Sequence, residues 1–216
     1  MSDFKRAWVF AGGEFSSQHF PADVLLDGDL VVCVDAGLKH CLSLELQPDL
    51  LVGDMDSVSP ELLHDKRLTN VERHVYPSKK ASSDLQLALE VLSTRAVSEV
   101  VLLGVSGGRT DHMLFNWHLV LLRLWPFKIQ LIDETMHAYV LEGEQGVEVH
   151  SRPGQTLSLL AMRSCEGVTT SGLQYPLSKA TIHPGDTLGL SNVVETCDAS
   201  VEISSGLLLV MVQRLN

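Results

Sequence analysis

The 216-residue sequence predicts an α/β amino-terminal domain with a mostly parallel sheet, in a Rossmann-like, three-layer arrangement, followed by an all-β carboxy-terminal sandwich. Two patterns support this fold class. The first two thirds of the chain alternate short apolar runs with amphipathic segments, and strands without polar alternation are typical of parallel sheets covered on both faces. The last third contains short β-rich runs separated by turn signals, as in antiparallel sandwiches or barrels. We expect the domains to span residues 1–137 and 138–216.

Six apolar runs in the first two thirds are the expected strands of the parallel sheet. Most of them end at a glycine, an aspartate or a proline, which are residues that favour turns. The six runs are Ala7–Ala11, Leu30–Val34, Leu50–Val52, Val71–Tyr76, Val100–Leu103 and Lys128–Ile132. Parallel strands need crossover connections, so helices are expected between them.

Two segments have the pattern of crossover helices. From Asp84 onward, apolar residues recur at the i, i+3, i+4 and i+7 positions of a helix, and Ser82 or Ser83 provides a natural N-cap. The run His112–Trp125 is long and largely apolar, so we expect it to form a buried helix.

The last third is predicted to form a small all-β domain. Pro-Gly and Ser-Gly pairs separate its β-rich runs, and such pairs favour turns. The expected strands are Val147–His150, Thr156–Ala161, Gly167–Ser171, Thr187–Leu190, Ser200–Ile203 and Leu207–Gln213.

The composition excludes several classes of protein. With 16 basic and 27 acidic residues the formal net charge is −11, which argues against nucleic acid as a partner because phosphate backbones attract Lys and Arg. No apolar stretch approaches the roughly 20 residues that span a bilayer, and the apolar start is too short for a signal peptide. The four cysteines form no C-x-x-C pair. We therefore expect a soluble, cytoplasmic protein that does not bind membranes.

Acidic residues follow the expected strands at the ends where ligands usually bind. Asp35, Asp54 and Asp56 come after strand ends, and Asp84 and Asp111 open the helices after later strands. In open α/β sheets, ligands bind outside the carboxyl ends of the strands, so these acids should converge on one edge. Carboxylates packed together repel each other unless a cation lies between them. The pattern indicates a Mg²⁺ site, since Mg²⁺ prefers oxygen ligands and phosphate-bearing substrates.

The D-x-D sequence at Asp54–Asp56 also has a purely structural explanation. In that alternative, Asp56 and Ser57 cap the following helix, and Asp54 forms a turn.

A glycine-rich loop is the second candidate site. Gly107, Gly108 and Arg109 join a buried strand to the helix that Asp111 and His112 begin. Backbone N–H groups at a helix start and a guanidinium both suit an anion, so the loop predicts a phosphate site. It lacks the Walker and G-x-G-x-x-G patterns. The alternative is a tight turn in which Asp111 caps the helix and Arg109 forms a surface ion pair.

A third candidate precedes the helix at Asp84. Lys80 is placed to neutralise phosphate, Ser83 to donate a hydrogen bond, and Asp84 to bind the metal. The alternative is a solvated basic bend followed by an ordinary Ser-Asp helix cap.

These motifs together resemble the thiamine pyrophosphokinase family. Pro48–Ser57 is similar to the family signature P-D-x-x-x-G-D-x-D-S, and Gly107–Asn116 is similar to G-G-R-x-D-H-x-x-x-N. Weaker matches complete the series in the same order along the chain: Asp35–Gly37, Lys80–Asp84, Gly172–Leu177 and Gly189–Asn192.

The resemblance implies a two-domain homodimer that transfers the pyrophosphoryl group of ATP to the hydroxyethyl arm of thiamine, giving thiamine diphosphate and AMP. It implies that thiamine lies near the dimer interface, partly lined by the β domain. On this basis the metal ligands for Mg²⁺ are expected to be Asp54, Asp56 and Asp84, with Asp35 assisting catalysis. The expected ATP-binding residues are Lys80, Gly107, Gly108, Arg109, Asp111 and His112. The expected thiamine-binding residues are Ser83, Asp84, Ser191 and Asn192.

Two substitutions distinguish this chain from the family pattern. Ala81 stands where the family usually has Asp, and Ser83 stands where it has Thr. The loss of a carboxylate at Ala81 supports one alternative, a thiamine- or nucleotide-binding protein with impaired catalysis. The other alternative is a different D-x-D Mg-dependent phosphotransferase or hydrolase. Phosphohydrolases with an Asp nucleophile carry D-x-D after the first strand, whereas here it follows the third.

Overall fold

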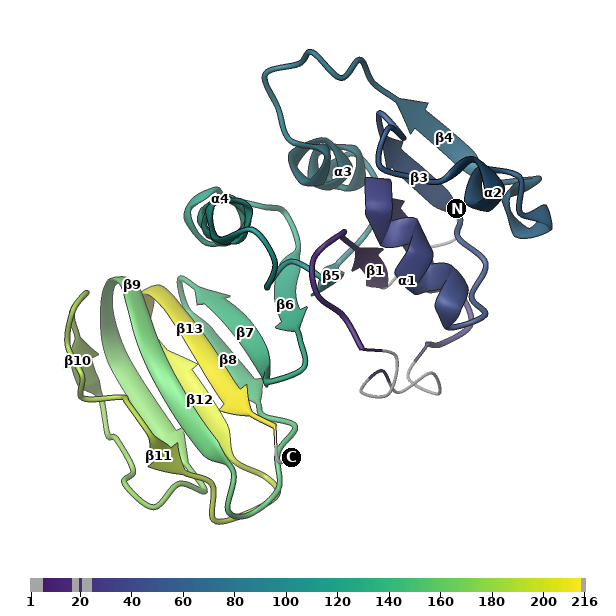
Figure 1. Ribbon diagram of the computed structural model, residues 1–216. Coiled ribbons are helices and arrows are strands. Elements are labelled where there is room, and N and C mark those ends of the chain that lie inside the picture. The colour runs from purple at the N-terminus through teal and green to yellow at the C-terminus, as the bar shows by residue number, and fades with distance from the viewer. Residues whose placement is uncertain (1–5, 17–19, 21–24, 215–216) are drawn as a thin grey trace. The chain divides into compact units, whose positions relative to one another are not determined.

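The computed structural model describes residues 6–16, 20 and 25–214, and it is a mixed, sheet-dominated fold with few helices (Figure 1). The chain forms two compact units, Met1–Asp133 and Glu134–Asn216. The expected boundary lay after His137. The observed division comes a few residues earlier, because strand β7 (Met136–Glu142) belongs to the second unit.

The first unit is built on a parallel sheet with strand order β4-β3-β2-β1-β5-β6. All six predicted runs contribute a strand: β1 (Arg6–Phe10), β2 (Leu30–Val34), β3 (Leu50–Gly53), β4 (Glu72–Val75), β5 (Glu99–Leu103) and β6 (Lys128–Ile132). The chain moves outward from β1 to β4 and then returns to the other side of β1 with β5. The strand order thus reverses between β1 and β5, and ligands commonly bind at the carboxyl ends of the strands at such a reversal.

Short helices connect these strands, and Ser83 is the N-cap of the helix that begins at Asp84. Its hydroxyl accepts a hydrogen bond from the Gln86 N–H at 3.2 Å, which confirms the predicted cap. The buried residues of this helix recur at the predicted helical spacing. The helical elements are η3 (Asp35–Gly37), α1 (Leu38–Ser43), α2 (Pro60–Leu63), η4 (Lys66–Leu68), α3 (Asp84–Ser93) and α4 (Thr110–Leu122).

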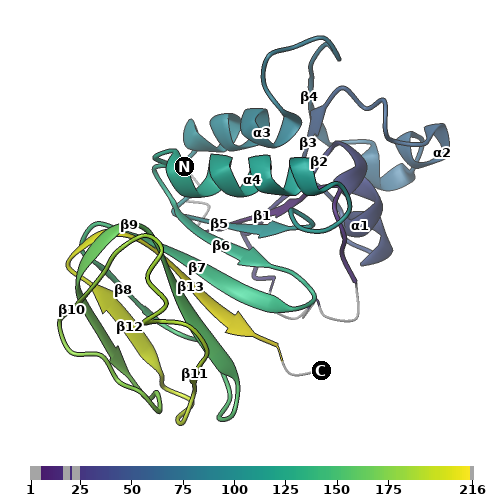
Figure 2. The same cartoon turned by 60° about the vertical axis from the view of Figure 1, so that its left-hand side comes forward.

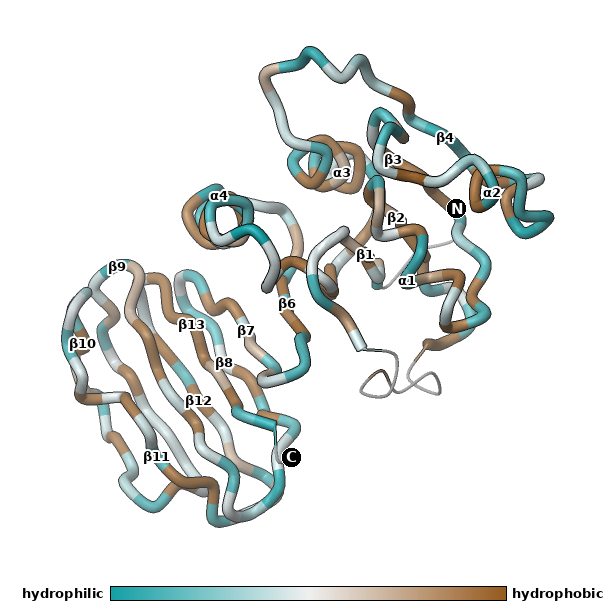
Figure 3. The backbone as a smooth tube through the Cα atoms, in the orientation of Figure 1, coloured by the Kyte–Doolittle hydropathy of each residue, from teal (hydrophilic) through white to brown (hydrophobic). Residues whose placement is uncertain are grey.

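The parallel sheet is buried by helices that pack on it. Trp8 and Phe10 of β1 share a buried apolar cluster with Leu38 and Cys41 of α1. Side chains alternate along a strand, so Val9 faces the opposite side of the sheet, where α3 contacts β2 and β3. Figure 2 shows α3 and α4 running side by side, and an ion pair of 2.9 Å joins Arg123 to Glu90. In Figure 3 hydrophobic stretches follow the central strands, as this packing requires.

The prediction that His112–Trp125 forms a buried helix is wrong in two respects. Helix α4 ends at Leu122, because Arg123 has an extended backbone and Pro126 disfavours helical conformation just before it. Leu114 and Phe115 are 55% and 79% exposed. Apolar residues occur on every face of this helix, so an apolar face remains exposed whichever face packs against the protein. Among the described helices, none has the combination of length and apolar character needed to cross a bilayer.

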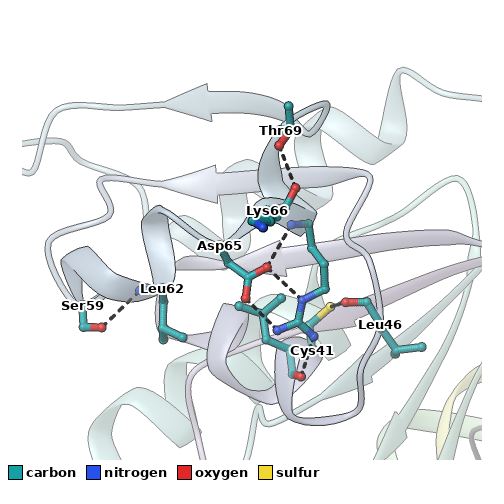
Figure 4. Close-up of polar contacts among 9 residues, drawn as sticks. Cys41, Leu46, Ser59, Leu62, Asp65, Lys66 and Thr69 are labelled. Atoms are coloured by element: carbon teal, nitrogen blue, oxygen red, sulfur yellow. Dashed lines mark hydrogen bonds and ion pairs between the residues drawn. The ribbon is translucent and has the colours of Figure 1, made fainter.

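A clasp around Arg67 fixes the chain between β3 and β4 (Figure 4). The guanidinium donates to both carboxylate oxygens of Asp65, at 3.0 and 2.7 Å, and to the Leu42 carbonyl at 2.9 Å. The hydrogen bond from Arg67 lowers the pKa of Asp65 to about 2. The clasp ties η4 to the end of α1, so the segment after β3 is anchored at its far end.

The second unit consists of antiparallel strands in the order β7-β13-β9-β12-β8, with β10 and β11 also paired to β9. Their buried side chains form one apolar cluster. The remaining strands are β8 (Gln145–Glu148), β9 (Thr156–Ser171), β10 (Ala180–Ile182), β11 (Asn192–Val193), β12 (Ser200–Ile203) and β13 (Ser205–Gln213).

Several predicted strand limits in this unit are wrong. Two predicted strands are parts of the single 16-residue strand β9, because pairing with β13 continues through the residues between them. Thr187–Leu190 forms no strand but a turn, closed by a 3.0 Å hydrogen bond from the Leu190 N–H to the Thr187 carbonyl. The apolar residues of this segment resembled a strand pattern in the sequence. In the structure, however, Leu188 and Leu190 are exposed and do not belong to the core.

Candidate functional site

Three of the predicted acidic residues meet at the carboxyl edge of the parallel sheet. Asp35 follows β2, Asp54 follows β3, and Asp84 begins α3. One carboxylate oxygen from each lies within 4.8 Å of the other two. Asp56 is not part of this group, since its side chain is exposed and accepts a hydrogen bond from the Ser57 hydroxyl at 3.0 Å.

The backbone between β3 and Asp56 determines which acids converge. Gly53 has a φ of 144°, and a Cβ at this position would lie 3.2 Å from the Asp35 Cβ and 3.3 Å from Asp84 Oδ1. Asp35 and Met55 also have positive φ values, 46° and 62°. Non-glycine residues adopt this conformation at a cost, and such residues cluster at functional sites.

Among the described residues, Lys80 is the cation that pairs with the acidic cluster. Its Nζ lies 3.0 Å from Asp84 Oδ1 and 3.5 Å from Asp54 Oδ2. Burial, together with the charges of Asp84 and Asp54, raises the pKa of Asp35. The pKa of Asp54 is lowered, first of all because its carboxylate accepts the Asp56 N–H at 3.2 Å. One ammonium therefore offsets only part of the negative charge of three carboxylates.

The donor set of the cluster fits a divalent cation. Asp35 Oδ1 is buried and has no hydrogen-bond partner among the described residues. Asp84 Oδ1 is also buried, and its polar contact is the Lys80 ammonium. Carboxylate oxygens that converge without donors of their own are the ligands that hard divalent cations prefer. Asp35, Asp54 and Asp84 are thus the residues suited to hold such an ion.

The buried carboxylate of Asp35 leads to a stability prediction. Because the folded-state pKa is raised, ionisation destabilises the metal-free fold once the pH exceeds the unfolded-state pKa of about 4. Asp35→Asn should therefore raise the free energy of unfolding by a few tenths of a kcal/mol at pH 7, after allowance for solvent screening, and Asn also tolerates the positive φ.

Urea unfolding in the presence of a chelator measures this effect. The gain should shrink as the pH falls toward about 4 and be absent below it, where the wild-type carboxyl is protonated in both the folded and the unfolded state. Asp27→Asn, in the exposed turn before β2, is the matched control and should change little. A variant at Asp35 that is less stable than the wild type at pH 7 would contradict the assignment.

The glycine-rich loop 104–109 joins β5 to the N-terminus of α4. Gly107 and Gly108 have φ values of 77° and 64°, which glycine adopts without strain. No side chain at the N-cap bonds the first turn of α4. Arg109 and Asp111 form an exposed ion pair, at 2.6 and 3.1 Å, which confirms that part of the alternative drawn from the sequence. The other part is wrong, because the N-cap residue of α4 is Arg109 and Asp111 lies within its first turn. His112 is exposed beside them.

The segment after β1 forms a second part of this site that was not predicted from the sequence. Main-chain hydrogen bonds of 2.8, 2.7 and 2.9 Å join Ala11, Gly13 and Glu14 to the chain at residues 103–106. A Cβ at Gly13 would lie 2.4 Å from the Ser106 carbonyl oxygen, so only glycine fits. The Glu14 carboxylate accepts the Gly108 N–H at 3.0 Å. The Gly-Gly pair ending the first predicted strand was the signal for this close approach.

In the second unit, the Asn192 side chain forms hydrogen bonds that hold the backbone at Tyr175. Its Oδ1 accepts the N–H groups of Tyr175 at 3.1 Å and Val193 at 2.8 Å, and its Nδ2 donates to the Tyr175 carbonyl at 2.7 Å. Asn192 is buried, whereas Tyr175 is 63% exposed. Ser191, with a φ of 57°, is exposed beside it. Asn192 thus positions Tyr175, and the Ser191 N–H donates to the Ser158 hydroxyl at 3.0 Å.

Ala81 lies outside the acidic cluster. It is exposed in the bend before α3, between Lys80, which contacts two of the acids, and the N-cap Ser83. The three-carboxylate group forms without an acid at position 81.

Comparisons with known proteins identify relatives of the chain. Two family models match the chain: the thiamin pyrophosphokinase catalytic domain over residues 22–132 and the thiamin pyrophosphokinase vitamin B1 binding domain over residues 144–208. A thiamine pyrophosphokinase of Bacillus subtilis is 27% identical over 184 residues, covering 84% of this chain and 86% of that protein. Thiamine pyrophosphokinase 1 of rice is 27% identical over 75% of this chain and 64% of its own length.

Solved structures show the same fold. The Bacillus subtilis thiamine pyrophosphokinase structure superposes with a TM-score of 0.83 at 24% identity, over 98% of this chain and all of that one. The Candida albicans thiamin pyrophosphokinase gives a TM-score of 0.76 at 14% identity, over 99% and 90% of the two chains. With its acidic cluster, its glycine-rich loop and matching models over both units, the chain belongs to the thiamine pyrophosphokinase family, whose known activity is transfer of the pyrophosphoryl group of ATP to thiamine.

Proposed function

We propose that the first unit carries the active site of a magnesium-dependent thiamine pyrophosphokinase that forms thiamine diphosphate and AMP. The observation that carries this proposal is the gathering of Asp35, Asp54 and Asp84 within 4.8 Å, inside the region matched by the catalytic-domain model. A Rossmann-like, three-layer first domain and a sandwich-like second domain are the finer description that we favour, because the strand order reverses at β1 and the second unit contains only strands.

In the proposed reaction the hydroxyl oxygen of thiamine attacks the β-phosphorus of ATP. A new oxygen–phosphorus bond forms, the bond from the β-phosphorus to the α,β-bridging oxygen breaks, and AMP leaves with that oxygen. The hydroxyl proton passes to a nearby carboxylate. The protein does little covalent work in such a transfer, so positioning and charge stabilisation account for most of the catalysis.

The acidic cluster would hold Mg²⁺, which neutralises the phosphate charge when bound. Asp35, Asp54 and Asp84 are the ligands that we propose, so Asp35 replaces Asp56 in the set expected from the sequence. Asp56 would act through its N–H, which fixes Asp54 Oδ1 at 3.2 Å. Lys80 stands beside the cluster, where its ammonium can shift from the carboxylates to a phosphate oxygen.

The loop after β5 would bind the triphosphate. The Gly107 and Gly108 amides lie before the start of α4, where N–H groups and the helix dipole favour an anion. Arg109 is 70% exposed and can exchange Asp111 for phosphate oxygens, leaving Asp111 and His112 on the nucleotide side.

We assign the thiamine contacts to Ser83 and Asp84 in the first unit and to the loop around Ser191 in the second, within a homodimer as in the family resemblance. Tyr175 is the aromatic residue that we add, since Asn192 holds its exposed ring in place. The thiazolium is cationic, so an aromatic face attracts it.

Product analysis tests the proposal. The protein is mixed with thiamine, ATP and Mg²⁺, and with the same mixture containing a chelator. We expect thiamine diphosphate and AMP in equal amounts, formed only with the metal. Phosphate release without thiamine diphosphate would instead identify a hydrolase, and ligand binding without AMP would identify a protein with impaired catalysis.

A further inference from the structure

The carboxylate of Glu14 lies against the glycine-rich loop. Glu14 Oε1 accepts the Gly108 N–H at 3.0 Å. A Cβ built on Gly107 would lie 2.5 Å from the Glu14 Cδ and Oε2, so the carboxylate lies directly against this part of the loop. The Glu14 carboxylate therefore occupies the position that a phosphate oxygen would take.

Glu14 and a phosphate group cannot use this position together. A single N–H donates one strong hydrogen bond, and two anionic oxygens about 3 Å apart repel each other. The chain carries a formal net charge of −11, which adds to the repulsion of a triphosphate. Binding of phosphate to the Gly108 amide thus requires that Glu14 move away.

The attachment of the loop does not depend on the Glu14 side chain. Three main-chain hydrogen bonds already join residues 11–14 to residues 103–106. Glu14 is exposed, so its carboxylate can return to water when it is released. Exposed charge-assisted contacts of this kind are weak.

We propose that Glu14 is an internal competitor for ATP: its carboxylate occupies the phosphate position in the nucleotide-free enzyme and is displaced by the triphosphate. Glu14 would thereby lower the affinity for ATP and select for ligands with enough phosphate charge to displace it. This inference rests on the proposed function of the loop.

Binding measurements on the full chain test the competition. Glu14→Gln keeps the size of the side chain and removes its charge. By titration calorimetry with ATP in the absence of thiamine, we expect this variant to bind about threefold to tenfold more tightly than the wild type. Inorganic pyrophosphate should show the same gain, and adenosine, which has no phosphate, should show none. A damaged loop would weaken binding, so tighter binding is not a consequence of misfolding.

Glu148→Gln, on the exposed edge of β8, is the control for the change in net charge and should bind ATP like the wild type. Unchanged or weaker ATP binding by Glu14→Gln would overturn the inference. An equal change in adenosine affinity would also overturn it, because Glu14 would then act on the nucleoside and not on the phosphates. Failure of the wild type to bind ATP at all would refute the proposed function, so the two failures are distinguishable.

Discussion

Replacing Asp54 by Asn is expected to lower kcat/KM for metal-dependent pyrophosphoryl transfer by roughly a thousandfold or more, while the fold remains intact. Asn has the shape of Asp but carries no charge, so the three-acid group loses a ligand that a divalent cation needs. Groups that stabilise charge in the transition state typically account for effects of about this size. Asp84→Asn should act in the same way.

Two measurements separate loss of the metal site from loss of the fold. Mn²⁺ binding to the free protein, followed by electron paramagnetic resonance, should weaken in both variants, whereas urea unfolding with chelator present should change little. Asp27→Asn removes the same charge from an exposed turn at the opposite end of β2 and should retain wild-type activity. Near-normal turnover by Asp54→Asn would refute the metal assignment.

Replacing Gly37 by Ala should destabilise the protein by about 3 kcal/mol, as severe overpacking does. A Cβ at Gly37 would lie 1.9 Å from the Phe10 carbonyl oxygen and 2.5 Å from the Phe10 carbonyl carbon. These are backbone atoms of the buried strand β1, which no rotamer change can move. Either β1 or the start of α1 must shift, and Asp35 lies two residues away.

The backbone conformation is not the reason for this effect. Gly37 has a φ of −62°, which Ala adopts readily, so the whole cost is steric. Gly28→Ala is the converse control: its φ is 93°, but a Cβ would meet nothing within 4 Å, so about 1 kcal/mol of conformational cost is expected. Urea unfolding of both variants measures the difference, and equal losses would contradict the steric explanation.

The parallel sheet and the edge at which its acids lie could be predicted from the order of residue types along the chain. All six runs formed strands. The central ones did so because apolar segments of that length, alternating with helices, are buried on both faces in a parallel sheet, whereas β4 is an exposed strand at the edge of the sheet. Asp35, Asp54 and Asp84 converge because they follow the strands or begin a helix, and parallel strands end at the same edge. The Ser83 cap could also be predicted, because a helix cap depends on residues that are close in the sequence.

Which side chains face each other could not be predicted in this way and is known from the folded chain. Positive φ values at Gly53 and Met55 turn the chain, so that Asp54 joins Asp35 and Asp84 while Asp56 points to solvent. Glu14 reaches Gly108 across 94 positions of sequence because β1 and β5 are neighbours in the sheet. The direction of a side chain depends on turn angles and on distant strands, and neither is encoded in the spacing of residue types along the chain.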